Sequence, residues 1–276
     1  MRSYGPFAVD GKKMVPVVSN RADLSAPVPS LYSKDFHPAH ISGLNAFIEK
    51  NSILPLMAEC AAITYRHCKL HCCPWCDLSR SQALRADWLP RIPPAAPSVY
   101  VRLSVASSHS LEAAWADLRA ARARFGRRSW LSSQCASWFR STEVTLSRGM
   151  WNVHDNIVVL GTPEDLEAVR RTVAAKWAAA AAAVGVEAVE GAQYAKHARS
   201  TVAVREYVLK GVMAYASDPS RGRTPGNLIR DWSQGDPDAG EHFREFENFI
   251  GEHPKGLHFT QRGGEARQKA DYDLAS

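Results

Sequence analysis

The stretch SWFRSTEVTLSRGMWNVHDNIVVL, residues 137–160, decides how the chain is interpreted. Two runs rich in apolar, aromatic and β-branched residues flank the polar tetrapeptide SRGM, which predicts two strands joined as a hairpin. The second run ends in Ile, Val and Leu, as a buried strand should, but its first half carries His154, Asp155 and Asn156. Because side chains alternate across a strand, His154 and Asn156 should share one face and Asp155 should lie on the other.

The first strand of this hairpin carries Glu143, which faces the same side as His154 and Asn156 if the strands pair through the turn. A carboxylate, an imidazole and an amide oxygen suit Mg²⁺ or Mn²⁺ better than zinc. The alternative is a hydrogen-bonded His–Asn pair that holds no metal. We take these three residues as candidate ligands of a catalytic cation.

Further along the chain, Tyr207 and Lys210 are three residues apart and should share one face of a predicted helix. A tyrosine attacks a phosphate when a cation polarises its target, and a lysine can stabilise the developing charge. Together with the hairpin residues, this pair predicts phosphodiester transfer. Taken singly, the tyrosine could be an ordinary aromatic of the core or surface, and the lysine a solvated charge.

The composition is that of a globular protein with a basic balance. The chain has 276 residues, 45% of them hydrophobic, which allows one large domain or two modest ones. The 34 Lys and Arg residues exceed the 28 Asp and Glu residues, giving a net charge of +6, which fits a nucleic-acid partner. No apolar run reaches about 18 residues, and the start lacks an apolar signal core, so we expect no membrane segment and a cytoplasmic protein.

Five of the six cysteines lie within one short stretch, which in a reducing cytosol indicates a metal more often than disulfides. The spacing Cys68-x4-Cys73-x2-Cys76 predicts a structural zinc site. We select Cys60 as the fourth ligand, and the alternatives left open are His67, His71 and Cys72. The isolated Cys135 reads as a small buried hydrophobe.

Composition and breaker residues divide the chain into five segments. These are a loose N-terminal arm (1–40), a helical and Cys-rich candidate zinc-binding segment (41–89), a Pro-rich linker (90–98), a main domain (99–264) and a polar tail (265–276). Periodicity and caps also predict the elements. They are a helix over 41–59 broken at Pro55, helices over 77–89, 111–125, 162–185, 201–216 and 241–250, strands over 99–107, 137–146 and 151–160, a weaker strand or loop over 186–197, and a turn over 221–226.

The helix after Ser110 ends in a group of arginines suited to DNA phosphates. The alternative is a solvated charged face, which charge patterning favours at least as much. The candidate DNA-binding residues are Arg119, Arg122, Arg124, Arg127 and Arg128.

The order of these motifs resembles that of the rolling-circle plasmid replication initiators, the Rep proteins of the HUH endonuclease superfamily. The likeness covers about residues 60–264 and rests on an ordered set of segments rather than on one motif. HCCPWC (71–76) is similar to the family's C-P-x-C finger, and VYVRLSV (99–105) is similar to its first core strand. The hairpin FRSTEVTLSRGMWNVHDNIVVL (139–160) is similar to its Glu-bearing and His-bearing strands. REYVLKG (205–211) is similar to its Tyr-x-x-Lys nucleophile helix, and RTPGNLIRDWSQGD (223–236) to its C-terminal block.

The resemblance implies an α+β fold with a central antiparallel sheet, helices on its faces and a small Cys-rich, zinc-finger-like segment before it. It implies that Glu143 and His154 are metal ligands, Tyr207 the nucleophile and Lys210 its cationic helper. The chain departs from the family where a second metal histidine is expected, because Asn156 stands there. Either the Glu/His/Asn set is active, or the centre has decayed and only DNA binding remains; retention of the other four residues favours activity.

The function implied is initiation of plasmid replication. The protein would bind an origin in locally single-stranded DNA, nick one strand through a 5′-phosphotyrosyl intermediate with a divalent cation, and later rejoin strands, with a host helicase and polymerase as partners. Another HUH enzyme, such as a transposase or relaxase, is an alternative. Relaxases usually carry three histidines and an N-terminal tyrosine, which this chain lacks, and the absence of a Walker-type Gly-rich loop argues against a fused helicase.

Overall fold

The structure is a computed structural model of the chain. It describes residues 8–10, 13–15, 38–62, 68–91, 96–126, 131, 135, 137–189, 191–198, 204, 207–214, 216, 222–253, 257 and 259–264.

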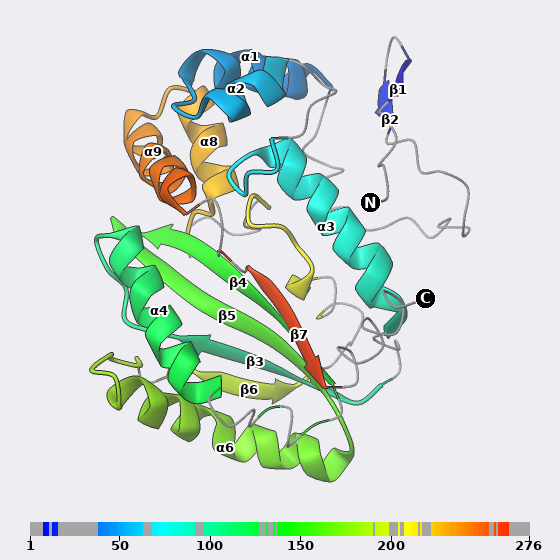
Figure 1. Cartoon of the computed structure of the whole chain (residues 1–276), viewed down its shortest axis with the longest axis vertical. Coiled ribbons are helices and arrows are strands. Elements are labelled where there is room, and N and C mark those ends of the chain that lie inside the picture. The colour runs from blue at the N-terminus through cyan, green and yellow to red at the C-terminus, as the bar shows by residue number, and fades with distance from the viewer. Residues whose placement is uncertain are drawn as a thin grey trace.

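A five-stranded antiparallel sheet lies at the centre of the molecule, in the order β6-β3-β5-β4-β7 (Figure 1). The predicted hairpin is β4 and β5, and its turn places Arg148 and Gly149 in the left-handed region, at φ 52° and 71°. β5 is the middle strand and is buried from Val153 to its end. The strands of the sheet are β3 (Ser98–Ser104), β4 (Ser137–Ser147), β5 (Met150–Leu160), β6 (Tyr194–His197) and β7 (Thr260–Gly264).

Helices cover both faces of this sheet, so the predicted α+β class with a central antiparallel sheet is confirmed. α4 (Leu111–Gly126) and α6 (Pro163–Ala182) pack on one face, over the main apolar core. α3 (Pro74–Trp88) packs on the other, where the ring centroid of Trp88 lies 5.1 Å from that of Phe139. No helix in the described part of the chain is long and apolar enough to span a bilayer.

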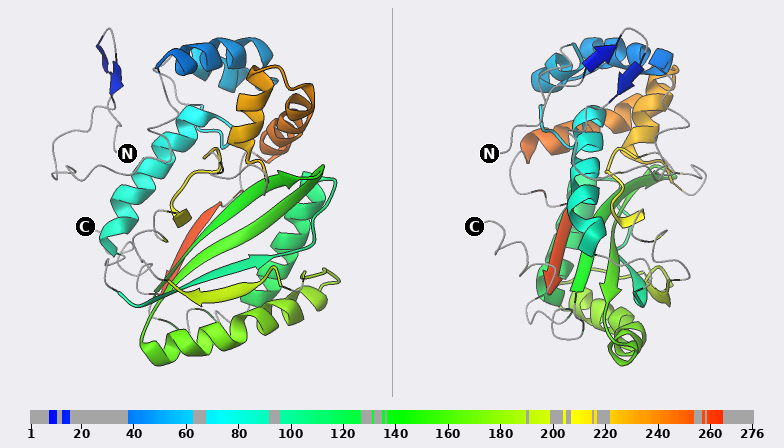
Figure 2. Two further views of the ribbon diagram at one scale, coloured as in Figure 1. Left: turned by 180° about the vertical axis from the view of Figure 1, so that it is seen from behind. Right: turned by 90° about the vertical axis from the view of Figure 1, so that its right-hand side faces the viewer.

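The remaining helices gather at one end of the sheet, as the views from the front and from behind both show (Figures 1 and 2). α8 and α9 pack on each other, as do α1 and α2. Their bounds are α1 (Pro38–Asn51), α2 (Pro55–Ala62), α8 (Pro225–Ser233) and α9 (Pro237–Glu252), and a short 3₁₀ turn, η1 (Leu89–Arg91), follows α3.

Several predicted boundaries are confirmed. α1 ends and α2 begins on either side of the predicted break, with Pro55 as the first residue of α2. α6 begins with a capping box in which the Thr162 hydroxyl accepts from the backbone N–H of Asp165, and the chain after it turns at Gly185 with φ 74°. Within residues 186–197, which we predicted as a weaker strand or loop, the last four form β6.

Other elements differ from the prediction. In the stretch predicted as a loose arm, β1 (Ala8–Asp10) and β2 (Lys13–Val15) pair as a hairpin. Strands of three residues are too short to produce a periodic pattern, which is why the sequence did not reveal them. We also missed β7 and α8, although the capping box of Thr224 and Asn227 at the start of α8 is a local signal for that helix.

The helix predicted over residues 201–216 is shorter than expected. Val204, Tyr207 and Val208 are helical, whereas residues 209–214 form turns and irregular backbone. Tertiary contacts decide this, because the backbone after Val208 is held by α3 rather than by the next helical turn.

Asp155 is held on the α4 face of β5 by a buried ion pair. Its two oxygens accept from the Arg122 guanidinium at 2.7 and 3.0 Å, and one also accepts from the Thr142 hydroxyl at 2.8 Å. The pairing corrects one of our predicted DNA contacts, because the Arg122 side chain reaches into the fold instead of facing solvent. Arg119 and Arg124 are exposed on the same helix, and Arg127 and Arg128 lie outside the described residues.

We expect the Arg122→Met variant to lose about 3 kcal/mol of unfolding free energy, because the buried Asp155 carboxylate keeps only the Thr142 hydroxyl and Arg140, whose Nε lies 3.9 Å away. Arg119→Met is the matched control, on the exposed face of the same helix, and should stay within about 0.5 kcal/mol of the wild type. Urea unfolding followed by circular dichroism measures both. Equal stability of the two variants would contradict this role for the ion pair.

Candidate functional site

Glu143 and His154 form the centre of the candidate site, on the sheet face that is turned away from α4. They lie directly opposite each other on β4 and β5, so their side chains project from the same face. The distance from His154 Nε2 to Glu143 Oε2 is 2.9 Å, and the histidine is only 2% exposed. Glu143 and His154 therefore face the same side of the sheet, as the alternation of side chains along the two strands predicted. We call this side of the sheet the site face.

Asn156 extends the pair by one step along β5. Its amide Nδ2 donates to Glu143 Oε2 at 3.2 Å, and its amide oxygen accepts from the hydroxyl of Tyr100 on β3. Tyr100 was not among the predicted site residues. A tyrosine in an alternating strand looks like a core aromatic, and only the strand order shows that β3 lies beside β5 on this side.

Tyr207 and Lys210 reach the same carboxylate from residues 207–214, which we call the Tyr207 segment. The Tyr207 hydroxyl donates to Glu143 Oε2 at 2.7 Å, although the two residues are 64 positions apart in sequence. The Lys210 ammonium forms an ion pair with Glu143 Oε1 and lies 4.0 Å from the centroid of the Tyr207 ring. The two do not share a helix face as predicted, because Lys210 lies in the turn after the helix ends. All the predicted catalytic and cation-binding residues nevertheless meet at Glu143.

The charges at this centre follow from burial and pairing. Burial would raise the pKa of the Glu143 carboxyl, but the hydrogen bond from His154 and the charge and hydrogen bond of Lys210 outweigh it and hold that pKa well below its usual range. Burial lowers the pKa of His154, while burial and the nearby Glu143 charge raise the pKa of Tyr207 above its ordinary value. At neutral pH the resting centre therefore contains an ionised carboxylate, a neutral imidazole and a protonated phenol.

The predicted cation ligands fit a divalent ion only in part. Glu143 and His154 supply two suitable donor atoms that point at each other. The third ligand is turned away, because the oxygen of Asn156 accepts from Tyr100. The Lys210 ammonium also neutralises the one carboxylate, so a cation would bind only in competition with it.

Arg102 is a site-face residue that we did not predict. It lies opposite Asn156 of β5 on one side and opposite Tyr194 of β6 on the other, so it projects from the site face. Within the part of the chain that the structure describes, its guanidinium makes no hydrogen bond or ion pair, and its Nε is buried. In sequence it is one polar residue within a strand, so nothing marked it. A half-buried cation without a counterion points to an anionic ligand.

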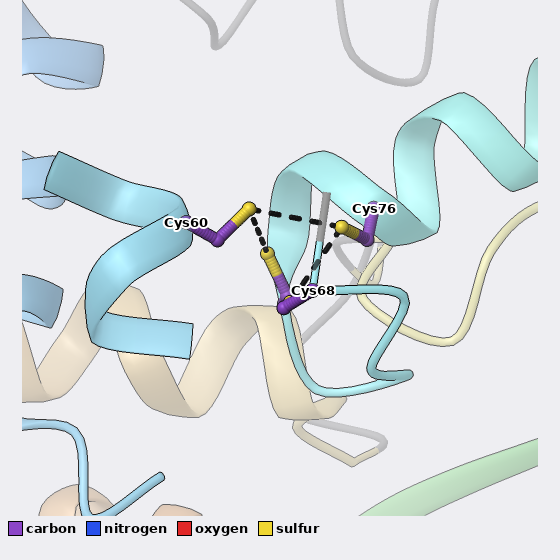
Figure 3. A group of neighbouring side chains, drawn as sticks. Cys60, Cys68 and Cys76 are labelled. Atoms are coloured by element: carbon purple, nitrogen blue, oxygen red, sulfur yellow. Dashed lines mark hydrogen bonds between the residues drawn. The ribbon is translucent and has the colours of Figure 1, made fainter. Parts of the chain in front are cut away.

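The cysteine cluster lies apart from this centre, between α2 and the start of α3 (Figure 3). Neighbouring sulfurs are 3.6 to 3.8 Å apart, and all four lie within 4.8 Å of one another. A tetrahedral zinc with Zn–S bonds of about 2.3 Å requires sulfurs about 3.8 Å apart. The cluster could therefore hold a structural metal such as zinc, and its members are Cys60, Cys68, Cys73 and Cys76.

The same geometry bears on the fourth ligand, which the sequence left open. Cys60 is in the cluster, whereas Cys72 lies outside it and His71 is engaged with Arg80 and the Phe259 ring. His67 lies outside the described residues. Hydrogen bonds from the neighbouring thiols lower the pKa of Cys76, and the backbone N–H of Lys69 also donates to its sulfur at 3.3 Å. A thiolate in this setting is ready to bind a metal.

Comparison of the chain with protein-family models, with curated proteins and with solved structures found no match in any of the three. The chemistry of the site must therefore be inferred from its own geometry.

We expect the purified protein to carry about one zinc ion per chain, because four converging thiolates form a closed structural site. The Cys68→Ser variant should lose it, whereas Cys135→Ser, a change of the same kind at a buried cysteine outside the cluster, should retain it. Elemental analysis after gel filtration measures the content. Zinc retained by Cys68→Ser, or missing from the wild type under reducing conditions, would overturn the assignment.

Proposed function

We propose that the protein is a DNA-nicking and strand-transfer endonuclease that initiates rolling-circle replication of a plasmid, on an HUH-type sheet. The observation that carries the proposal is the convergence of Tyr207, Lys210, His154 and Asn156 on the Glu143 carboxylate. A nucleophile, a proton acceptor and a cation in hydrogen-bond reach of one another are what transfer of a phosphodiester to a side chain requires.

In the reaction we propose, the Tyr207 oxygen attacks a phosphorus atom of single-stranded DNA. The phenolic proton passes to Glu143 Oε2, which already accepts a hydrogen bond from it. A bond from the tyrosine oxygen to phosphorus forms, the bond from phosphorus to the 3′ oxygen breaks, and the released 3′-hydroxyl takes up a proton. The 5′-phosphotyrosyl ester conserves the bond energy, so attack by a 3′-hydroxyl later recloses a strand without another energy source.

Substrate binding would itself activate the nucleophile. In the resting state Lys210 is paired with Glu143, whose pKa is too low for it to be a strong base. A phosphate group at the site competes for the lysine, and loss of that ion pair raises the pKa of the carboxyl. Glu143 then becomes a better acceptor for the Tyr207 proton while Lys210 moves its charge toward the phosphate.

Arg102 supplies the second positive charge. It projects from the same face, has no counterion among the described residues, and lies near enough to Tyr207 for its charge to favour the phenolate. We assign it to the non-bridging oxygens of the scissile phosphate, since guanidinium groups bind phosphates through paired donors.

The proposal includes a divalent cation, Mg²⁺ or Mn²⁺, for which Glu143 and His154 would be the ligands. It would polarise the scissile phosphate when bound. Lys210 is paired with the Glu143 carboxylate, and both the cation and the DNA phosphate would weaken this ion pair. We therefore expect the cation and the substrate to bind together.

The partners follow from the reaction. The DNA must be single-stranded where it is cut, because a stacked and paired phosphodiester does not reach a tyrosine on a protein surface. Tyr207 is 36% exposed, which allows that approach. An origin sequence, a host helicase and a polymerase that extends the 3′-hydroxyl complete the proposed system, and the net charge of +6 suits its DNA partner.

A second candidate is a DNA-binding protein on the same scaffold without cleavage. The observation that favours it is the engagement of Asn156 with Tyr100, which leaves the third predicted ligand position turned away from Glu143. A transposase or relaxase of the same superfamily remains a further alternative, and the DNA sequence captured by the protein would distinguish it from a plasmid initiator.

Incubation with a labelled random pool of single-stranded DNA and Mn²⁺ should yield a protein–DNA adduct that survives denaturing detergent. Tyr207→Phe should abolish the adduct, because it removes the attacking oxygen. Tyr194→Phe is the matched control, a change of the same kind on neighbouring β6, and should retain it. An adduct that persists in Tyr207→Phe would disprove the nucleophile, and its absence from the wild type with Mn²⁺ or Mg²⁺ would favour binding without cleavage.

Arg102→Gln should slow adduct formation by about 10²–10³-fold at saturating DNA, because it removes a charged donor from the developing phosphorane. Arg171→Gln makes the same change at an exposed arginine of α6, on the opposite side of the sheet, and should leave the rate within about twofold. Single-turnover kinetics with DNA recovered from the pool measure both rates. Equal rates for the two variants would remove Arg102 from the site.

A further inference from the structure

The first turns of α3 carry both metal ligands and residues that contact the Tyr207 segment. Cys73 is the N-cap residue, Cys76 lies in the first turn, and Asp77 follows it directly. Ser81 is one helical turn beyond Asp77, on the same side of the helix. The cysteine cluster and these two polar residues therefore belong to one short rigid element.

Asp77 and Ser81 are each only 2% exposed, and both hold the backbone of the Tyr207 segment. Asp77 Oδ2 accepts from the backbone N–H of Met213 at 2.9 Å, and the Ser81 hydroxyl donates to the carbonyl of Leu209 at 2.6 Å. Gly211, between them, lies so close that a Cβ there would overlap the Asp77 carboxylate. Only glycine allows this approach.

The opposite side of the segment faces the sheet. Tyr207 and Lys210 contact Glu143, and the apolar side chains of Val208 and Leu209 pack in the cluster that includes Phe139. The segment is thus held between α3 and the site face. Its backbone is bonded to α3 while its functional side chains reach the carboxylate.

We propose that the Cys₄ centre positions the nucleophile: with a metal bound, the four cysteines fix the first turns of α3, and Asp77 and Ser81 pass this constraint to the backbone that carries Tyr207 and Lys210. The inference rests on the proposed function and gives the cysteine cluster a role in it. Asp77 and Ser81 are positioning residues, because they act through the segment rather than on the DNA.

The start of α3 depends on the cluster for a physical reason. The side chain of its N-cap residue, Cys73, makes no capping hydrogen bond, so the first turn lacks the usual stabilisation by a polar cap. Its sulfur instead belongs to the cluster, where Cys73 and Cys60 are 3.8 Å apart. Without a metal, only weak thiol contacts of 3.6 to 3.8 Å join the four sulfurs, so the turn that holds Asp77 loosens.

The first experiment measures hydrogen–deuterium exchange in peptides that cover residues 207–214, without DNA. Zinc removal by a chelator, or the Cys68→Ser variant, should speed exchange there while peptides of β5, in the middle of the sheet, stay protected. Unchanged exchange in 207–214 after verified zinc loss would overturn the proposal. This arm does not use catalysis, so it remains decisive even if the proposed nicking activity fails.

The second experiment keeps the metal in place. Ser81→Ala removes the hydroxyl that holds Leu209, and Ser79→Ala makes the same change two positions away, at a serine whose side chain makes no hydrogen bond within the described residues. Ser81→Ala alone should speed exchange in 207–214 and slow adduct formation by about 10- to 100-fold, because small misplacements of reacting groups are costly. DNA affinity and zinc content should stay at the wild-type level.

If zinc removal unfolds the whole chain, β5 also loses protection and the first experiment gives no answer. The two serine variants then test the proposal, because both keep the metal. If Ser81→Ala and Ser79→Ala then show the same exchange in 207–214, α3 does not position the segment. A Ser81→Ala variant that weakens DNA binding in proportion to the rate would contradict a positioning role as well, since a misplaced nucleophile lowers the rate and not the affinity.

Discussion

The carboxylate of Glu143, whose side chain is only 11% exposed, is the constraint on which the arrangement depends. An ionised carboxylate inside a sheet is costly unless each oxygen is paired. Here the partners come from two separate parts of the chain, His154 and Asn156 on β5, and Tyr207 and Lys210 on the segment after β6. Satisfying this one charge brings the segment onto the sheet before any substrate is present, so the groups proposed for chemistry are already assembled in the resting protein.

The polarity of β5 has two independent causes, one on each face. Asp155 is neutralised by Arg122 from α4, and this pair belongs to the scaffold. His154 and Asn156 face the opposite side, toward Glu143. A middle strand buried on both sides needs a reason for each polar residue, since an unpaired one would destabilise the fold. Scaffold and site are thus separated by the thickness of a single sheet.

The sequence predicted which side chains lie together better than it predicted the path of the chain around them. The hairpin, the shared face of Glu143 and His154, and the cysteine cluster follow from short-range rules of alternation and spacing. Arg122 was misjudged because its partner lies on a strand whose distance from α4 only the packed structure reveals. Arg102 was missed because its significance rests on the lack of a counterion within the described part of the chain, which cannot be inferred from neighbours in sequence.

Long-range contacts also explain the remaining errors. The helix predicted to continue past Val208 gives way to turns because Asp77 of α3 binds the backbone there instead. Intrinsic helix preference is worth only a few tenths of a kcal/mol per residue, so contacts of this kind override it. β7 is short and lies at an edge of the sheet beside β4, which means that its existence depends on a neighbour far away in the chain.

The tight turn at Arg148 and Gly149 has a consequence for how the sequence can change. Because both residues adopt left-handed backbone, the turn fixes which residue of β4 faces which residue of β5. A single residue inserted into the hairpin near this turn would move Asp155 to the face of Glu143 and His154 to the face of Arg122. Two carboxylates would then meet on one side and two cations or donors on the other. The hairpin therefore tolerates the insertion of two residues better than of one. Its length is constrained by the charge that each face of the sheet requires, in addition to the geometry of the turn.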